Sequence, residues 1–298
     1  MKALINIRVV AFLAALGATT IYGINHTVAK GVMPDYVGAF GFIFLRTGGA
    51  ALLFWISSIF VKSEKIAKQD WKPLITAAIL GASINMLSFF KGLELSTPIN
   101  SSILVTITPI IVVIFSSILL KEKIYFTKVL GIAMGLVGAI GLVIYGKEVR
   151  MDAPNIPLGN TLFIVNATAY GLYLIVIKKV MEKYQPITVL KWVFTIAFIV
   201  NLPITYSSFN QINWEMPPSI IASVVFVILG TTYMTYLFNG FALTKLKAST
   251  VSSFVYVQPL IGIIVAILSG QDQLNFTKVA AGILVLSGVY FASKKQTI

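Results

Sequence analysis

The chain has 298 residues, of which 57% are hydrophobic and 11% are charged, and it contains no cysteine. Soluble domains carry about 25% charged residues, so this composition excludes an ordinary water-soluble protein, and the lack of cysteine excludes disulfides and thiolate chemistry. The formal net charge is +13, but the basic residues lie in short connections between apolar runs. That distribution is typical of membrane orientation and not of a nucleic-acid surface.

Apolar runs of about 20 residues recur along the whole chain, and a helix of that length crosses the roughly 30 Å hydrocarbon core of a bilayer. The first run follows Lys2 and Arg8. It is too long for the apolar region of a signal peptide and no small-residue cleavage site ends it, so we expect a retained helix. The expected spans are residues 9–32, 37–61, 73–93, 99–120, 126–145, 158–181, 187–209, 218–242, 248–269 and 274–292.

Lysine and arginine are distributed unevenly over the two sides of these spans. If the N-terminus lies inside, 17 of them fall on the inner side and five on the outer side, and Arg46 lies within a span. Because cytoplasmic loops carry the excess of basic residues, the count predicts that both termini are cytoplasmic.

The two halves of the chain repeat one another in sequence. At an offset of 150 residues, Pro109 aligns with Pro259 and the sequence FTKV at 126–129 recurs at 276–279. A unit of five spans is odd, so the second copy must enter the membrane from the opposite side. We therefore predict an all-α membrane protein of ten transmembrane helices, built as two inverted-topology five-helix repeats, residues 1–147 and 148–298.

Four passages carry a resemblance to a known family: IYGINHTVAKGV, FIFLRTGGAALLF, PINSSILVTITPIIVVIFSSILLKEK and GIAMGLVGAIGLVIYG. They are similar to the drug/metabolite transporter superfamily, specifically its ten-helix EamA-type members, and the resemblance covers essentially the full length. It implies the fold and a transport function, and Arg46 matches an arginine common in the second helix of that family. It does not name the substrate, because relatives move amino acids, other metabolites, nucleotide precursors and drugs.

The glycines of the fifth span recur every three or four residues and form a smooth helix face that favours close packing. In the superfamily's fold the fifth and tenth helices lie toward the periphery. The resemblance therefore implies either packing within the chain or a dimer contact there, and we expect a monomer or a homodimer.

All ten acidic residues lie in connections or at span ends. Antiporters that extrude lipophilic cations usually need a carboxylate at membrane depth, and the expected spans offer none. Glu94, at the outer end of the third span, is the nearest candidate for a coupling role. The alternative is an interfacial residue that pairs with Lys91.

Arg46 and His26 are ionisable groups inside expected spans. A charge near mid-depth costs roughly 2.5–3.5 kcal/mol on insertion scales and must face protein or water. Arg46 either binds the substrate or bonds carbonyl groups at a helix break. His26, the single histidine, suits proton coupling because it titrates near physiological pH, or it only donates a hydrogen bond.

Polar residues follow one face of several spans in both halves. Each of the prolines Pro109 and Pro259 removes a backbone hydrogen bond, which is tolerable in lipid only where protein or water compensates, so we expect two broken helices to line the pathway. The polar residues either line a central cavity or tie helices together. The predicted substrate-binding residues are Arg46, His26, Asn25, Asn85, Ser88, Thr106, Tyr170, Tyr236, Asn239 and Tyr256.

These features predict a secondary transporter that works by alternating access around a site near the midplane. The embedded cation favours a substrate with a carboxylate, such as an amino acid or a similar small polar metabolite, and the family resemblance implies export. A multidrug exporter and a passive uniporter or channel are the alternatives. An intramembrane enzyme is a further alternative. The chain has a single histidine, no cysteine and no acidic residue inside a span, which excludes zinc-dyad, thiol and aspartyl catalysis. A catalytic serine–lysine pair stays formally open.

We expect no cofactor, no metal and no nucleic acid. The expected partners are a small-molecule substrate and the lipid bilayer, and the expected location is the inner membrane of a bacterium.

Overall fold

The computed structural model of the protein describes residues 7–62, 64–144, 153–268 and 275–294. These residues form helices and connections, with no strand among them, and ten helical segments are long and apolar enough to cross a membrane. The prediction of ten spans is therefore confirmed. Six spans are single helices: α1 (Ile7–Lys30), α2 (Ala39–Ser58), α7 (Phe126–Ile144), α8 (Ile156–Met181), α9 (Pro186–Phe209) and α14 (Phe276–Ser293).

Two related spans, the fourth and the ninth, are broken near a proline. The fourth consists of α5 (Pro98–Val105) and α6 (Thr108–Leu119), and the ninth consists of α12 (Ala248–Ser253), a 3₁₀ turn η4 (Phe254–Tyr256) and α13 (Val257–Leu268). Pro109 has no N–H to bond the carbonyl of Val105, where α5 ends, and Pro259 has the same relation to Val255 in η4. The breaks expected from the two prolines are present.

The third and eighth spans contain a second kind of interruption, which the sequence does not predict. After the short 3₁₀ turn η1 (Lys68–Asp70), the third span runs through α3 (Trp71–Ala78), the π-helical segment η2 (Ile79–Ile84) and α4 (Asn85–Leu95). The eighth runs through α10 (Pro218–Phe226), the π-helical segment η3 (Val227–Met234) and α11 (Thr235–Lys245). The two π-helical segments begin 148 residues apart, so they occupy corresponding places in the two halves.

The two halves interlock. α1 packs on α11 and α13, while α8, its counterpart, packs on α4 and α6, the counterparts of α11 and α13. α2 lies against α9 in the opposite direction, since Phe44 contacts Phe209 and Trp55 contacts Trp192. Antiparallel counterparts are what an inverted repeat requires. The predicted fold class is confirmed, and which side faces the cytoplasm stays a prediction.

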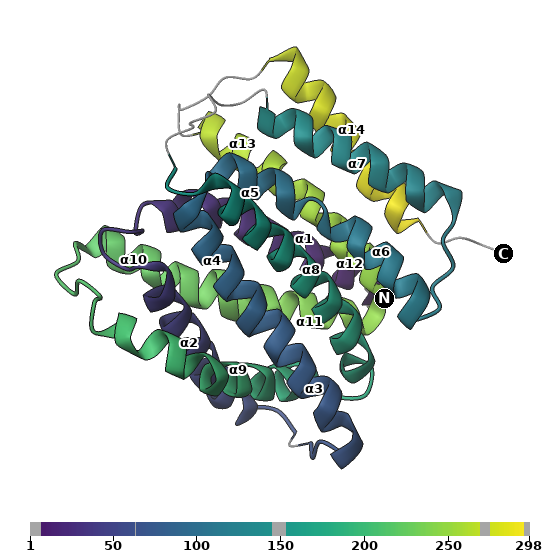
Figure 1. Ribbon diagram of the computed structural model, residues 1–298. Coiled ribbons are helices and arrows are strands. Elements are labelled where there is room, and N and C mark those ends of the chain that lie inside the picture. The colour runs from purple at the N-terminus through teal and green to yellow at the C-terminus, as the bar shows by residue number, and fades with distance from the viewer. Residues whose placement is uncertain (1–6, 63, 145–152, 269–274, 295–298) are drawn as a thin grey trace, which may run out of the picture.

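The glycine face of α7 packs against α14, and Figure 1 shows these two helices side by side at one edge of the bundle. A Cβ atom on Gly131 would lie 2.4 Å from the backbone nitrogen of Ala292, and one on Gly288 would lie 2.4 Å from that of Gly135. The backbones are therefore in direct contact. The glycines serve packing within the chain, which is one of the two roles that the sequence left open.

Candidate functional site

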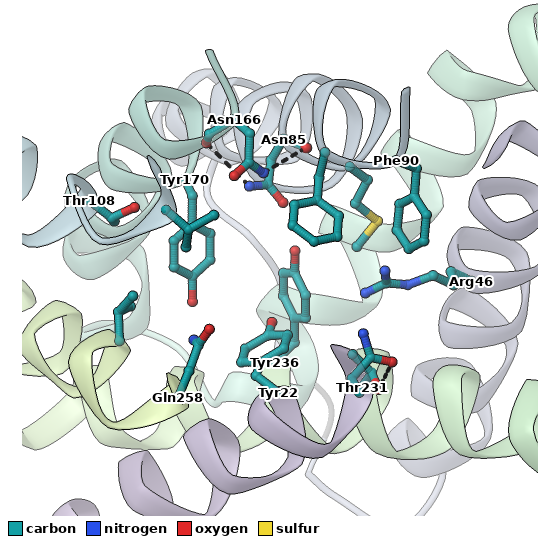
Figure 2. A pocket seen from close by; sticks show the side chains of 15 residues that line it. Tyr22, Arg46, Asn85, Phe90, Thr108, Asn166, Tyr170, Thr231, Tyr236 and Gln258 are labelled. Carbon is teal, nitrogen blue, oxygen red and sulfur yellow. Dashed lines mark hydrogen bonds between the residues drawn. The ribbon is translucent and has the colours of Figure 1, made fainter. Parts of the chain in front are cut away.

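A cavity of about 90 Å³ lies where the two halves meet, at the level of the helix breaks (Figure 2). A single water molecule needs about 10–15 Å³ by this measure, so the cavity has room for several waters or a small polar molecule. Residues of both halves line it: Tyr22, Asn25, Arg46, Asn85, Met86, Phe89, Phe90, Val105, Thr108, Asn166, Tyr170, Thr231, Tyr236, Val255 and Gln258.

Arg46, on α2, is the charged side chain of this lining. It is only 5% exposed, its Nε donates a 2.8 Å hydrogen bond to Thr232 Oγ1, and its Cζ lies 5.0 Å from the centre of the Phe90 ring. Among the described residues we find no ion pair and no other hydrogen bond of this guanidinium, which points into the cavity in Figure 2. A buried cation without a carboxylate is costly, and an anion in the cavity would offset that cost.

Side-chain amides hold neighbouring helices at the cavity. Asn85 on α4 and Asn166 on α8 each donate to the other's backbone carbonyl, over 3.4 and 2.9 Å respectively. On the other side, Asn25 Oδ1 accepts a 2.9 Å hydrogen bond from Thr231 Oγ1. These pairs leave part of each amide's hydrogen-bonding capacity available to a bound molecule.

Three tyrosines form the aromatic wall. The Tyr236 hydroxyl donates a 2.7 Å hydrogen bond to the Gly81 carbonyl in η2, and the Tyr170 hydroxyl accepts one of 3.1 Å from Asn239 Nδ2. Tyr22 corresponds to Tyr170 at an offset of 148 residues, and both line the cavity. The aromatic wall therefore draws on both repeats.

Thr108 and Gln258 are a second repeat-related pair, at an offset of 150, and they line the cavity just after the breaks of the fourth and ninth spans. Thr108 is 1% exposed, and its Oγ1 is buried without a hydrogen-bond partner. Buried hydroxyls are normally paired, so this atom is available to a ligand. Figure 2 shows the Gln258 amide pointing toward the Tyr170 hydroxyl.

The π-helical segments supply backbone carbonyls that accept side-chain hydrogen bonds, from other spans in η2 and from within the segment in η3. In η2, Gly81 O accepts from Tyr236 and Ala82 O accepts a 3.1 Å hydrogen bond from Asn201 on α9. In η3, Val227 O accepts a 2.9 Å hydrogen bond from Thr232 Oγ1, the atom that also accepts from Arg46. π-Helical turns often mark functional sites. Thr231 of η3 lines the cavity, and so does Asn85, which directly follows η2.

The two ends of the cavity differ. All six residues of α12 are buried, whereas Asn100 and residues 102–105 of its counterpart α5 are partly exposed. At the α12 end, Ser249 donates to Glu122 Oε2 at 2.5 Å and accepts from Lys128 Nζ at 2.7 Å. This cluster ties the buried helix α12 to the start of α7 and to the connection before it.

Further contacts join the connections at that end. Lys183 Nζ lies 2.6 Å from Asp70 Oδ1, and Tyr184 donates a 2.9 Å hydrogen bond to Asp70 Oδ2. The hydrogen bond to Asp70 raises the pKa of Lys183 above its ordinary value. These contacts join the second and sixth connections.

Five of the predicted site residues meet at the cavity: Arg46, Asn25, Asn85, Tyr170 and Tyr236. Ser88 and Asn239 are buried on α4 and α11 outside the lining, where Asn239 supports Tyr170, and Thr106 donates to the carbonyl of Ile103 in its own span. Tyr256 is fully buried in an apolar cluster with Ile132 and Val285, with its hydroxyl unpaired.

The remaining predicted residues lie elsewhere. Pro109 and Pro259 each follow a lining residue, Thr108 and Gln258. Glu94 forms a 2.9 Å pair with Lys91 at the exposed end of α4, as the alternative reading expects. His26 falls within α1, and its side chain lies outside the described part of the structure.

Sequence reasoning missed the other five polar residues of the lining, which are Tyr22, Thr108, Asn166, Thr231 and Gln258. The repeat held a usable signal, because Thr108 and Gln258 correspond to one another and each directly precedes a proline at the break. No comparable signal marks Asn166, whose neighbours in the sixth span include Ile164, Val165, Ala167 and Ala169.

Comparison with known proteins places the chain among transporters. Residues 9–144 and 157–294 each match the EamA-like transporter family. A protein of Archaeoglobus fulgidus described as an uncharacterized transporter is 26% identical over 277 residues, which cover 93% of this chain and 96% of that protein. The uncharacterized transporter YyaM of Bacillus subtilis is 21% identical over 286 residues, which cover 95% and 93% of the two chains.

A solved crystal structure has the same fold. It superposes with a TM-score of 0.76 and covers 95% of this chain and 96% of that one at 16% sequence identity. The matches of both halves, the full-length relatives and the ten spans agree, and the chain belongs to the EamA-like transporter family of multi-pass membrane transporters.

Proposed function

We propose that this transporter is a secondary carrier of a small, polar, carboxylate-bearing metabolite, and that Arg46 binds the carboxylate. The observation that carries the proposal is the guanidinium of Arg46, which is buried in the cavity lining with a single hydroxyl as its hydrogen-bond partner among the described residues. Guanidinium presents a planar fork of donors that matches a carboxylate, so a bound acid would supply both the missing charge and the missing acceptors.

The rest of the lining supports a small polar substrate. Thr108, Gln258 and the two asparagines Asn85 and Asn166 offer uncharged donors and acceptors opposite the cation. An amino group could be held there by amide and hydroxyl oxygens and by the faces of the aromatic rings. An amino acid or a similar metabolite therefore fits the lining better than a larger molecule does.

The lining argues against the multidrug alternative. A lipophilic cation would meet Arg46, and no carboxylate occurs among the described lining residues to offset the repulsion. Cation exporters of this kind usually rely on an embedded acid. The charge of the cavity thus favours acids over organic cations.

Alternating access is the transport mechanism that we propose, with the halves 1–147 and 148–298 as the moving units; their boundary lies outside the described residues. The inverted repeats and the unequal cavity ends support it. If the two repeats exchanged their conformations, the α5 end would become buried and the α12 end would become exposed. The basic residues of the connections and the family resemblance support cytoplasmic termini, a bacterial inner membrane and export. For proton coupling, His26 and Glu94 remain proposed residues.

Transport in liposomes tests this function. Purified protein would be reconstituted and loaded with each of a panel of amino acids and hydroxy acids, and exchange of the labelled compound would be measured for the wild type, Arg46→Met and Arg46→Lys. Lys191→Met serves as a matched control, because Lys191 stacks on Trp55, 4.4 Å from its ring centre, away from the cavity. We expect acid exchange in the wild type and the control, a strong loss in Arg46→Met, and an intermediate rate in Arg46→Lys.

Exchange of quaternary amines alone, unaffected by Arg46→Met, would overturn the proposal. The same liposomes separate a coupled carrier from a passive uniporter or channel. An imposed pH step drives net flux against the substrate gradient in a proton-coupled carrier, whereas a passive pathway only dissipates that gradient.

A further inference from the structure

The central cavity has two unlike ends. Arg46 and Phe90 stand at one end of it in Figure 2, and Thr108 and Gln258 stand at the opposite end, with the ring of Tyr236 between them. We infer that the preferred substrate carries, at the end remote from its carboxylate, an uncharged hydrogen-bonding group such as a hydroxyl or a carboxamide. This inference rests on the proposed function and adds the chemistry of the substrate's other end.

The helices that carry the two ends belong to different parts of the bundle. α2, which carries Arg46, packs on α4, α9 and η3. α6 begins at Thr108 and packs on α8 and α12, while α13 carries Gln258 and packs on α1 and α7. Among the described residues, neither α6 nor α13 packs closely against α2. A group bound beside Thr108 and Gln258 is therefore separated from the guanidinium.

The side chains of the far end have hydrogen-bonding capacity to offer. Thr108 is 1% exposed, and its Oγ1 is buried without a partner. The side-chain amide of Gln258 is half-buried in the lining, and we find no hydrogen bond for it among the described residues. Buried polar groups are normally paired, so a hydroxyl or a carboxamide of the substrate would supply the missing partners.

The backbone at the two helix breaks is bonded within the chain. Free N–H groups at a helix start attract anions. Here the Ile107 N–H donates to the Leu104 carbonyl at 3.2 Å, and the Ile110 N–H donates to the Ile107 carbonyl at 3.0 Å. In the ninth span, the N–H of Val257 bonds to the carbonyl of Phe254. These N–H groups are occupied, which favours recognition of the substrate by the two side chains.

The far end is also electrically neutral. Arg46 is the only charged residue among the described residues that line the cavity. A substrate with a second carboxylate or an ammonium group at its far end would bury that charge without a counter-ion, which is costly. The far end therefore favours an uncharged polar group over a group of either charge.

An apolar group at the far end would leave Thr108 and Gln258 without partners. A site that hydrogen-bonds its substrate rejects an analogue without the bonding group more strongly than an apolar pocket rejects a missing methylene, because buried polar groups are left unpaired. Thr108 and Gln258 are therefore specificity residues, which select between polar and apolar substrates of the same shape.

Isosteric amino acids test this inference. Thermal stabilisation of the purified full-length protein would be titrated with four pairs: threonine and valine, asparagine and leucine, glutamine and homoleucine, and serine and α-aminobutyrate. Both members of a pair present the same carboxylate to Arg46. In at least one pair, we expect the polar member to bind at least about tenfold more tightly than the apolar member. Aspartate should bind less tightly than asparagine, since it adds a charge.

Variants locate the preference. Thr108→Val and Gln258→Met remove the hydrogen-bonding groups at nearly constant size, so each should weaken the preference for the polar member, and the double variant should lose it. Thr168→Val and Gln211→Met are matched controls that should retain it, because Thr168 bonds a carbonyl of its own helix and Gln211 is exposed in a connection. All of these variants should still prefer an acid to its α-amide, the property assigned to Arg46.

Equal binding of the two members in all four pairs would overturn the inference, as would no response to any of these compounds while another amino acid binds. A preference that survives in Thr108→Val/Gln258→Met, or tighter binding of aspartate than of asparagine, would also overturn it.

The α-amides identify which claim has failed. If the wild type binds acids more tightly than their α-amides but does not distinguish polar from apolar members, the proposed function stands and the inference fails. If no acid stabilises the wild type, the proposed function fails and the inference fails with it.

Discussion

The third and eighth spans carry the same backbone irregularity and use it differently. In η2, the carbonyls of Gly81 and Ala82 accept hydrogen bonds from uncharged donors on two other spans, Tyr236 and Asn201. In η3, the carbonyl of Val227 is bonded by Thr232, which in turn accepts from Arg46. The first π-helical segment is a junction between helices, whereas the second connects directly to the buried cation of the cavity.

This difference indicates that the repeat supplies the shape of the site and single substitutions supply its chemistry. The breaks, the π-helical segments and the tyrosines Tyr22 and Tyr170 recur in both halves. Arg46 does not recur: at the offset of 148 its counterpart is Phe194, whose ring packs edge-on against Tyr236 with centres 4.8 Å apart. A symmetric scaffold therefore holds one asymmetric charge.

Replacing that charge should have the largest effect. We expect Arg46→Met to lower transport of the preferred acid by roughly 10- to 150-fold, because hydrogen bonds to a charged group contribute about 1.5–3 kcal/mol. Proteoliposome exchange measures the loss. The melting temperature of the substrate-free protein should stay the same or rise, since methionine is close in size and removes an unpaired buried cation.

The melting temperature distinguishes the two roles that the sequence left open for Arg46. An arginine that mainly supports a helix break would lower the melting temperature when replaced. A drop of several degrees in Arg46→Met, with transport lost in proportion to folded protein, would favour the structural role.

The corresponding glycines of the two π-helical segments should respond unequally to alanine. A Cβ on Gly81 would lie 2.2 Å from the buried ring of Tyr173, whereas one on Gly230 would lie 3.2 Å from the side chain of Phe226. Overpacking of this kind costs about 1–3 kcal/mol. Thermal melting should show clear destabilisation of Gly81→Ala and little change in Gly230→Ala, and equal melting temperatures would contradict the close packing at η2.

Chemical labelling can compare the two ends of the cavity, and the lack of native cysteine leaves no background. Ser102 is partly exposed, and its counterpart Ser252 is 1% exposed. A water-soluble maleimide should modify Ser102→Cys about tenfold faster than Ser252→Cys in detergent, where both faces are accessible. Equal rates would show that the α12 end is not closed in solution.

The hydroxyl of Thr232 should have a smaller effect on the substrate than Arg46 itself. Thr232→Val removes the acceptor that orients the guanidinium, and a net hydrogen bond contributes about 0.5–1.5 kcal/mol, so we expect a two- to tenfold loss of apparent affinity in exchange assays. Asn201→Leu, the matched change at η2, should lower stability and leave the apparent affinity unchanged. If both variants lose affinity equally, the distinction between η2 and η3 fails.

Much of the fold could be predicted from the sequence because membrane spans are long and apolar. The sequence also predicts the two breaks, since a proline removes a specific backbone bond. The π-helical segments could not be predicted, because they contain no proline. The carbonyls of η2 accept hydrogen bonds from other spans, and that of Val227 in η3 accepts one from Thr232 within the segment. The expected third span, residues 73–93, is likewise shorter than the observed Lys68–Leu95.

Part of the site could be predicted, because polar residues stand out in an apolar span. Arg46, Asn25 and Asn85 are conspicuous because polar side chains at membrane depth are costly. Tyr256 was selected by regular helical spacing from Ser252, but the 3₁₀ turn η4 changes the helical repeat there and Tyr256 lies in an apolar cluster. Helical spacing stops being informative at the breaks that shape the cavity.

The account depends most on the claim that Arg46 recognises a carboxylate. The direct measurement is thermal stabilisation of the purified protein by each of the twenty amino acids and by the matching carboxamides, with Arg46→Met in parallel. We predict that at least one acid raises the melting temperature of the wild type, that its carboxamide does not, and that Arg46→Met responds to neither. Equal stabilisation by acid and carboxamide, or an undiminished response of Arg46→Met to the acid, would contradict the claim.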